Sequence, residues 1–181
     1  MNALPLSLMT VAREISLDDG ALDLLRDDLS QRSAVRALLD NGDAPAALRL
    51  ALRLMPRGYV VPWVCQCVRG EALDAEDHEG LRIAETWLRE RTEPSRRAAL
   101  HFAASQHYVG TGALLAASAG WSEGFLLDGE GRDVAPVAPQ LLAVAAAAAL
   151  LTLVSGSPDF ADRCRQFAIA AMALLSPEDI P

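Results

Sequence analysis

Residues Leu141–Val154 read LLAVAAAAALLTLV, a run of fourteen residues that carries no charge and is largely alanine. Alanine has the highest intrinsic helix propensity, so the run predicts a helix. A helix that spans a bilayer needs about 20 apolar residues, and this run falls short of that length. A helix that is apolar on all sides is typical of a protein core. We therefore expect Gln140–Val154 to be a buried core helix.

The composition of the whole chain extends this prediction. Alanine supplies 33 of the 181 residues, and 51% of the residues are hydrophobic although only 5% are aromatic. β-Branched residues are sparse, which disfavours a large sheet. The length fits one domain with a sizeable apolar core. These observations predict an all-α fold of about eight helices packed as antiparallel helical hairpins.

End signals and apolar spacing place the helices along the chain. Asn41-Gly42 is a stop signal, and Asp43 is a candidate N-cap with Pro45 in the first turn that follows. Pro62 should kink its helix or shift its start. The predicted helical segments are Ala21–Leu29, Ser33–Leu39, Asp43–Met55, Arg57–Leu73, a segment opened by Asp74–Asp77 that carries Leu81 to Leu88, Ser95–Tyr108, Ala113–Ala119, Gln140–Val154 and Pro158–Leu175.

This pattern also predicts the domain organisation. We expect an N-terminal arm over residues 1–19, one helical domain over 20–175 and a tail over 176–181. The one long irregular stretch is 120–139, which has four Gly and two Pro. Long loops in compact domains are often functional.

A weak internal sequence repeat is relevant to the architecture. Leu48-Arg49-Leu50-Ala51 recurs as Leu81-Arg82-Ile83-Ala84, 33 residues later. Helical-hairpin repeats have periods near 34 residues, so a solenoid-like stack is one form of the predicted fold. Coincidence is at least as good an explanation in a chain so rich in leucine and alanine.

The charge of the chain excludes several classes of function. Its formal net charge is −8 and all sixteen basic residues are arginine. The absence of lysine removes Schiff-base chemistry and a P-loop lysine. An acidic surface repels nucleic-acid backbones and anionic membranes, so we expect neither as a partner.

The cysteines and the first residues bear on location. Three cysteines without a framework of spacings suit a reducing compartment. Residues 1–20 lack a basic segment followed by an apolar core, so we expect no signal peptide. Together these features predict a cytoplasmic protein.

Two short motifs are typical of catalytic or metal-binding sites, but the predicted structure around them does not fit such a site. Gly120-Trp121-Ser122-Glu123-Gly124 matches G-x-S-x-G, but a nucleophile elbow needs a strand before it, and a helix is predicted there. Cys65 and Cys67 would point about 200° apart on a helix, so they would not share a metal ion. We therefore predict no catalytic residue, no metal site and no cofactor. A serine hydrolase that uses Ser122 remains a weaker alternative.

Arginine and aromatic residues are the best candidates for binding another protein, because Tyr, Trp and Arg dominate protein interfaces. Arg49, Arg53 and Arg57 are spaced as a stripe on one helix face. Tyr59 and Trp121 are candidate anchors, and Trp121 is the better one because it stands beside the Gly-rich loop. An acidic block over residues 71–79 follows the stripe, and the simpler explanation of both is two solvated faces.

Several short motifs occur in order along the middle of the chain. They are Met55-Pro56-Arg57, Trp63–Arg69, Ala84–Leu88, Pro94–Ala99, Trp121–Gly124 and a Pro-rich loop before the Ala-rich helix. Together they resemble a family of uncharacterised bacterial proteins encoded near type VI secretion genes, and the resemblance covers about residues 45–155. This chain departs from the family at Tyr59–Pro62, where a more polar helix start without proline is expected. The resemblance implies a cytoplasmic accessory, adaptor or chaperone that helps to load cargo, and it brings no catalytic residues.

The sequence therefore predicts a non-enzymatic protein-binding accessory, adaptor or chaperone of a secretion system. Its partner would be another protein, a secretion component or an effector, and a homo-oligomer remains open. The alternative is an immunity protein whose acidic face neutralises a basic toxin.

Overall fold

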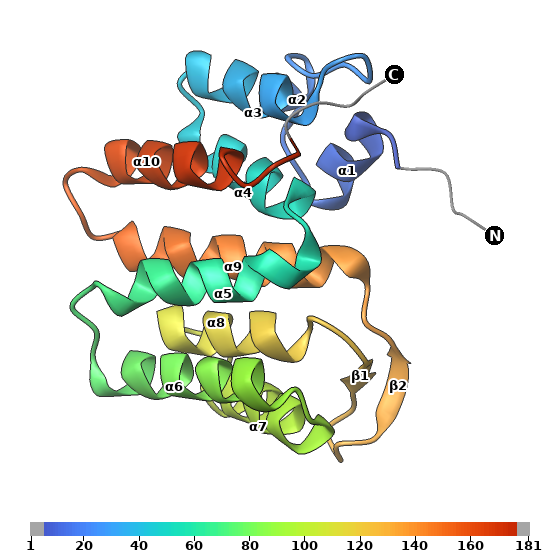
Figure 1. The fold of residues 1–181 in the computed structure, drawn as a ribbon, viewed down its shortest axis with the longest axis vertical. Helices are drawn as coiled ribbons and strands as arrows, with labels where there is room; N and C mark the ends of the chain where they lie inside the picture. Colours follow the sequence, from blue (N-terminus) through green and yellow to red (C-terminus); the bar gives the residue numbers. More distant parts are fainter. Residues whose placement is uncertain (1–5, 177–181) are drawn as a thin grey trace. The chain divides into compact units, whose positions relative to one another are not determined.

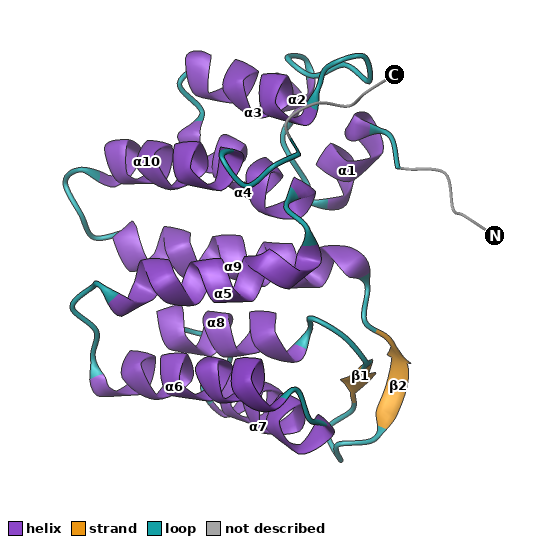
Figure 2. Ribbon diagram, viewed as in Figure 1, coloured by secondary structure: helices purple, strands orange, loops and turns teal. Residues whose placement is uncertain are grey.

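A computed structural model describes residues 6–176, and these form ten α-helices and one two-stranded sheet (Figures 1 and 2). The predicted all-α fold is confirmed. The contacts divide the described chain into two compact units, one of residues 6–56 and 157–176 and the other of residues 57–156. The predicted single domain over 20–175 stays a prediction, because contacts within each unit do not test it. Residues 1–5 of the predicted arm and 177–181 of the predicted tail lie outside the described residues.

The first unit is built around α4 (Ala44–Leu54), which contacts α1 (Leu8–Glu14), α3 (Gln31–Asp40) and α10 (Phe160–Met172). Seven of the eleven residues of α4 are buried, all of them Ala or Leu. The predicted signals at its start are confirmed, because Gly42 has φ +85° and the Asp43 side chain accepts a hydrogen bond from the amide of Ala46. The part of the predicted arm that is described docks on α4 as α1.

One helix of this unit is much shorter than predicted. The segment Ala21–Leu29 should have been helical throughout, but α2 covers only Asp19–Leu22. An Asp27 carboxylate oxygen accepts the amide of Met9 at 2.9 Å, at the start of α1. Beyond Asp23 the chain forms short turns, in which amides donate to carbonyls three residues back rather than four. Leu25 is nevertheless buried, so the apolar spacing identified core residues but not their backbone conformation.

The second unit surrounds α8 (Thr111–Gly120), which contacts α5 (Arg57–Arg69), α6 (Ala75–Glu90), α7 (Glu93–Ser105) and α9 (Pro139–Val154). Nine of the ten residues of α8 are buried, and most of them are Gly, Ala or Ser. Eight residues of α9 are buried as well, which confirms the predicted core helix. None of the described helices has the length and apolar character that a bilayer span requires.

Several elements of this unit differ from the prediction, among them α7, which covers Glu93–Ser105 and not Ser95–Tyr108. The helix α5 ends at Arg69 and runs from Arg57 through Pro62, so the proline does not shift its start. The predicted break Gly110–Gly112 ends earlier, because Gly112 already belongs to α8. The stretch 120–139, predicted to be irregular, contains β1 (Phe125–Leu127) and β2 (Asp133–Pro136), which pair antiparallel.

A close crossing of α6 and α8 explains the position of Gly112. A Cβ atom at Gly80 of α6 would clash with the backbone of Gly112, and one at Gly112 would lie 2.6 Å from the Cα of Asp77. The two helices therefore touch backbone to backbone. The Asp77 carboxylate also accepts the amide of Gly112 at 2.6 Å. It supplies the cap that Gly110, the N-cap residue of α8, does not provide.

We predict that Gly80→Ala lowers the free energy of unfolding by about 2 kcal/mol or more, since a forced overpacking typically costs 1–3 kcal/mol. Gly58→Ala is the matched control, because Gly58 lies in α5 with open space around its missing Cβ. The control should stabilise the protein by up to about 1 kcal/mol, the usual difference between Gly and Ala in a helix. Urea unfolding followed by circular dichroism measures both. Equal stabilities of the two variants would contradict the close crossing.

Candidate binding groove

A cavity of about 560 Å³ lies between α7 and the β1–β2 hairpin. Its volume is in the range of pockets that bind small molecules, about 300–1,000 Å³. Most of its side chains are apolar or aromatic, and the charged ones belong to α7 and to the hairpin tip. It is lined by Arg97, Leu100, His101, Ala104, Tyr108, Trp121, Leu126, Leu127, Asp128, Gly129 and Gly131. We call this cavity the groove.

A stacked aromatic pair contributes to the lining of the groove. The rings of Tyr108 and Trp121 have centroids 5.4 Å apart and planes 14° apart. Trp121 is the C-cap residue of α8, whereas Tyr108 follows α7 after His107. Both His107 and Tyr108 have left-handed backbone conformations, with φ of 53° and 58°. Such a conformation costs a non-glycine residue roughly 1–2 kcal/mol, and offset stacking returns about 0.5–1.5 kcal/mol.

A buried arginine attaches the hairpin to the helices. Arg96 is only 2% exposed, and its Nη1 donates to the carbonyls of Gly120 at 3.2 Å and Phe125 at 3.1 Å. Its Nε and Nη2 donate to the two carboxylate oxygens of Glu93, each at 2.7 Å. Gly124 has φ +81°, and a Cβ there would lie 2.9 Å from the Arg96 guanidinium. The chain therefore wraps closely around Arg96 between α8 and β1.

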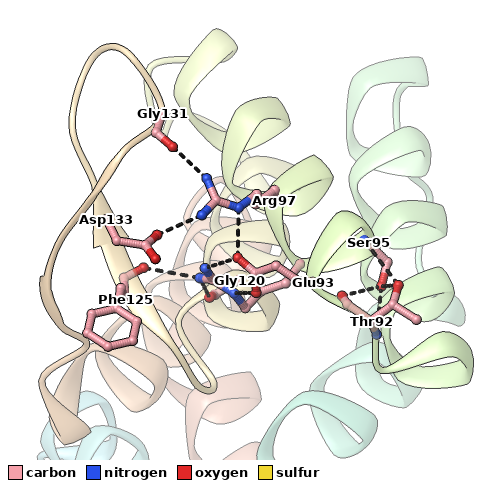
Figure 3. Close-up of polar contacts among 9 residues, drawn as sticks. Thr92, Glu93, Ser95, Arg97, Gly120, Phe125, Gly131 and Asp133 are labelled. Atoms are coloured by element: carbon pink, nitrogen blue, oxygen red, sulfur yellow. Dashed lines mark hydrogen bonds and ion pairs between the residues drawn. The ribbon is translucent and has the colours of Figure 1, made fainter.

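The next residue, Arg97, holds the far side of the hairpin (Figure 3). Its Nε donates to Glu93 and its Nη2 to Asp133, each at 2.7 Å, and its Nη1 donates to the Gly131 carbonyl. The hydrogen bonds from Arg96 and Arg97 hold the pKa of the Glu93 carboxyl below its usual range. One carboxylate thus joins two arginines that reach both strands of the hairpin.

The charges at the hairpin tip are also paired. The Asp128 carboxylate accepts the amides of Glu130 and Arg132 and the Arg132 Nε, at 2.8–2.9 Å. The backbone amide of Arg132 is the leading cause of the lowered pKa of Asp128. Because its carboxylate and guanidinium groups are largely satisfied by one another, the groove offers mainly its apolar lining to a ligand.

Trp121, the best of the predicted anchors, lines the groove, whereas Tyr59 does not. Tyr59 lies on α5 with 59% of its surface exposed, outside the groove lining. Arg57 starts α5, and its Nη2 donates to the Ser122 carbonyl at 2.7 Å.

The predicted stripe of Arg49, Arg53 and Arg57 is wrong. The helix α4 ends at Leu54 and Met55 is extended, with ψ 139°, because the residue before a proline avoids the helical region. Arg57 therefore lies on a different helix from the other two. Arg53 pairs with Glu14 at 2.7 Å, and Arg49 donates to the carbonyls of Ile15 and Ser16. Both hold the end of α1 against α4.

The structure shows the surroundings of Ser122 and of the two cysteines in the short motifs. The Ser122 hydroxyl donates to the Ala119 carbonyl at 2.7 Å, and the residues before Ser122 belong to helix α8 rather than to a strand. Burial raises the pKa of Cys65 and of Cys67 to about 12, so both thiols are protonated near neutral pH. Within residues 6–176, no group of three or more His, Cys, Asp or Glu side chains could hold a metal ion.

The acidic block is partly structural. Asp74 is the N-cap of α6, Asp77 caps α8, and Glu79 pairs with Arg82. Sequence reasoning missed Glu93, Arg96 and Tyr108. The only signal for the first two was a Glu followed by Arg at three and four residues, a spacing typical of ordinary surface ion pairs.

We predict that the hairpin loosens in acid through Glu93. The pKa of the Glu93 carboxyl is lowered in the folded state. The ionised carboxylate therefore stabilises the folded state when the pH is above the ordinary pKa of a glutamate. This stabilisation is lost as the pH falls through the lowered pKa. The NMR amide signals of Gly124 and Gly131 should therefore keep their neutral-pH shifts until the pH is below the usual range of a glutamate. In Glu93→Gln they should be shifted already at neutral pH. Signals that Glu93→Gln leaves unchanged would contradict this role.

Comparisons with known proteins identify the family of the chain. No curated protein and no solved structure matches it. A family described as a family of unknown function (DUF6931) matches residues 34–175. Because this match covers well over half of the 181 residues, the chain belongs to the DUF6931 family.

Proposed function

We propose that this chain is a non-enzymatic protein-binding accessory that takes the apolar face of a partner helix into the groove. The observation that carries the proposal is the groove itself, with Trp121 and Tyr108 stacked in its lining. Tryptophan and tyrosine are the side chains that most often dominate binding energy at protein interfaces.

The surroundings of the groove favour a protein over a small molecule. Phe125 and Val134 of the hairpin are 45% and 66% exposed, and Val109, next to Tyr108, is 73% exposed. A small ligand would leave these side chains in water, whereas a protein surface can cover them together with the groove. Exposed apolar side chains beside a cavity are typical of interaction sites.

The hairpin favours a helix over an added strand. A partner strand would need a free row of amides and carbonyls at a sheet edge. The Phe125 carbonyl of β1 already accepts Arg96. Pro136 of β2 has no amide, and the register shifts between Leu126 and Leu127. Proline and bulges are the usual protection of an edge strand, so side-chain insertion is the better mode.

The role in type VI secretion, as an adaptor or chaperone, rests on the resemblance of the sequence motifs and stays a prediction. The immunity protein also stays a prediction, supported by the net charge of −8. The two differ in the partner, which is a secretion component or cargo in the first case and one basic toxin in the second.

We predict that Trp121→Ala weakens partner binding by roughly 30-fold or more, the equivalent of about 2 kcal/mol for a hot-spot residue. A partner would first be captured from an extract of the native host and purified. Its dissociation constant would then be measured for the wild type and for the variant. Tyr59→Ala is the matched control, because Tyr59 is an exposed aromatic residue of the same unit outside the groove.

A second variant separates loss of the site from loss of the fold. Ala104 is an exposed residue of α7 that lines the groove, so Ala104→Phe should fill the groove and keep the thermal midpoint of unfolding. It should weaken binding as Trp121→Ala does. A partner that binds both groove variants normally but fails to bind Tyr59→Ala would place the interface on α5 and refute the groove.

A further inference from the structure

A second, smaller cavity of about 180 Å³ lies in the same unit, where the start of α5, the end of α6 and the turn after α8 meet. Its lining includes Arg57, Arg91, Trp87, Ser122 and Glu123. The groove uses Trp121, whereas this cavity uses the two residues that follow it. The two sites therefore have separate linings.

The two arginines of the cavity are among those that form no ion pair within the described residues. Acidic residues outnumber arginines by 24 to 16, and seven arginines form ion pairs among the described residues. Neither Arg57 nor Arg91 pairs with a carboxylate in that part of the chain. Arg57 instead donates to the Ser122 carbonyl at 2.7 Å. Two positive charges and one negative charge, that of Glu123, therefore line the cavity, and neither arginine forms an ion pair with a described carboxylate.

The fold holds Arg91 in a defined position. Its backbone is left-handed, with φ 51°, and its amide donates to the Trp87 carbonyl at 2.8 Å. Its guanidinium lies over the Trp87 ring, 4.0 Å from the centroid. A guanidinium that stacks through its face keeps its N–H groups free at the edge. Trp87 itself is 1% exposed, and its Nε1 has no acceptor among the described residues.

The size and charge of the cavity select the ligand. A volume of about 180 Å³ is well above the ~10–15 Å³ that one water molecule needs, so the cavity has room for a small acid. The edge of a guanidinium matches a carboxylate with two parallel hydrogen bonds. Glu123 adds a negative charge to the lining, which opposes a phosphate dianion more than a single carboxylate. The positive end of α5, which begins at Arg57, adds a favourable field.

We infer that this cavity is a carboxylate-binding site, in which Arg91 holds the carboxylate through its free edge and Arg57 adds a second positive charge. The ligand is a small free carboxylic acid or the carboxylate end of another chain, and both share this recognition. The inference stands independently of the groove, because it uses other residues and another ligand chemistry.

The test is an NMR titration of the full chain with sodium propionate at constant ionic strength. The indole N–H signal of Trp87 is the readout, and it is identified by removing the other two tryptophan signals with Trp63→Phe and Trp121→Phe. We expect a saturable shift below about 0.1 M propionate, with sodium chloride as the baseline. N-Acetylglycine, a mimic of a chain end, forms a second arm, and N-acetylglycinamide is its neutral control. The arm with the tighter binding identifies the source of the carboxylate.

Three variants decide the result. Arg91→Gln should weaken propionate binding by about tenfold or more, the loss of a charge-assisted hydrogen-bonded pair. Arg89→Gln is the matched control, because it removes the same charge from the same helix outside the cavity, and it should bind as the wild type does. Glu123→Gln should bind propionate more tightly than the wild type does. This variant still tests the inference if Arg91→Gln misfolds. No saturable shift, tighter binding of phosphate than of propionate, or equal weakening by Arg89→Gln would overturn the inference.

Discussion

The contact between the backbones of α6 and α8 at Gly80 and Gly112 is the constraint on which the second unit depends. Four helices surround α8, and they can approach it because its own side chains are so small. The hydrophobic gain of each alanine is modest, but close packing of many small groups recovers dispersion energy over a large area. The hydrogen bond that the Asp77 carboxylate accepts also orients this contact, because it joins the first turn of α8 to α6. Packing and capping therefore fix the same helix start.

The far end of α8 is fixed by a different kind of interaction. Arg96 satisfies the Gly120 and Phe125 carbonyls while Glu93 neutralises its charge. A buried arginine without these partners would be costly, so the hairpin and the arginine require each other. Thr92 and Ser95 form a capping box at the start of α7 (Figure 3). This cap sets where α7 begins and hence the positions of Glu93 and Arg96. The geometry of the groove is thus determined by a helix cap, an ion pair and a glycine with positive φ.

The fold class could be predicted because alanine content and apolar spacing favour helices locally, and they do so along the whole chain. The failures have specific causes. Ala21–Leu29 has helical spacing, but Asp27 is used to hold the amide of Met9, a contact that no local pattern shows. The hairpin within 120–139 depends on Arg96 and Arg97, which lie more than twenty residues earlier in the chain. The three arginines of the predicted stripe have the right spacing, but Pro56 separates the third from the helix of the first two.

The candidate site was only partly predictable for the same reason. Trp121 stood out because tryptophan is rare in the chain and this one precedes a Gly-rich segment. Its stacking partner, Tyr108, had no signal, since two consecutive left-handed residues are needed to bring it there. The turn Trp121–Gly124 is held by Arg57 on one side, through the Ser122 carbonyl, and by Arg96 on the other, through the Gly120 carbonyl. Because both arginines bind backbone atoms, the turn is shaped before any ligand arrives, and a ligand of either cavity would lose less free energy in ordering it.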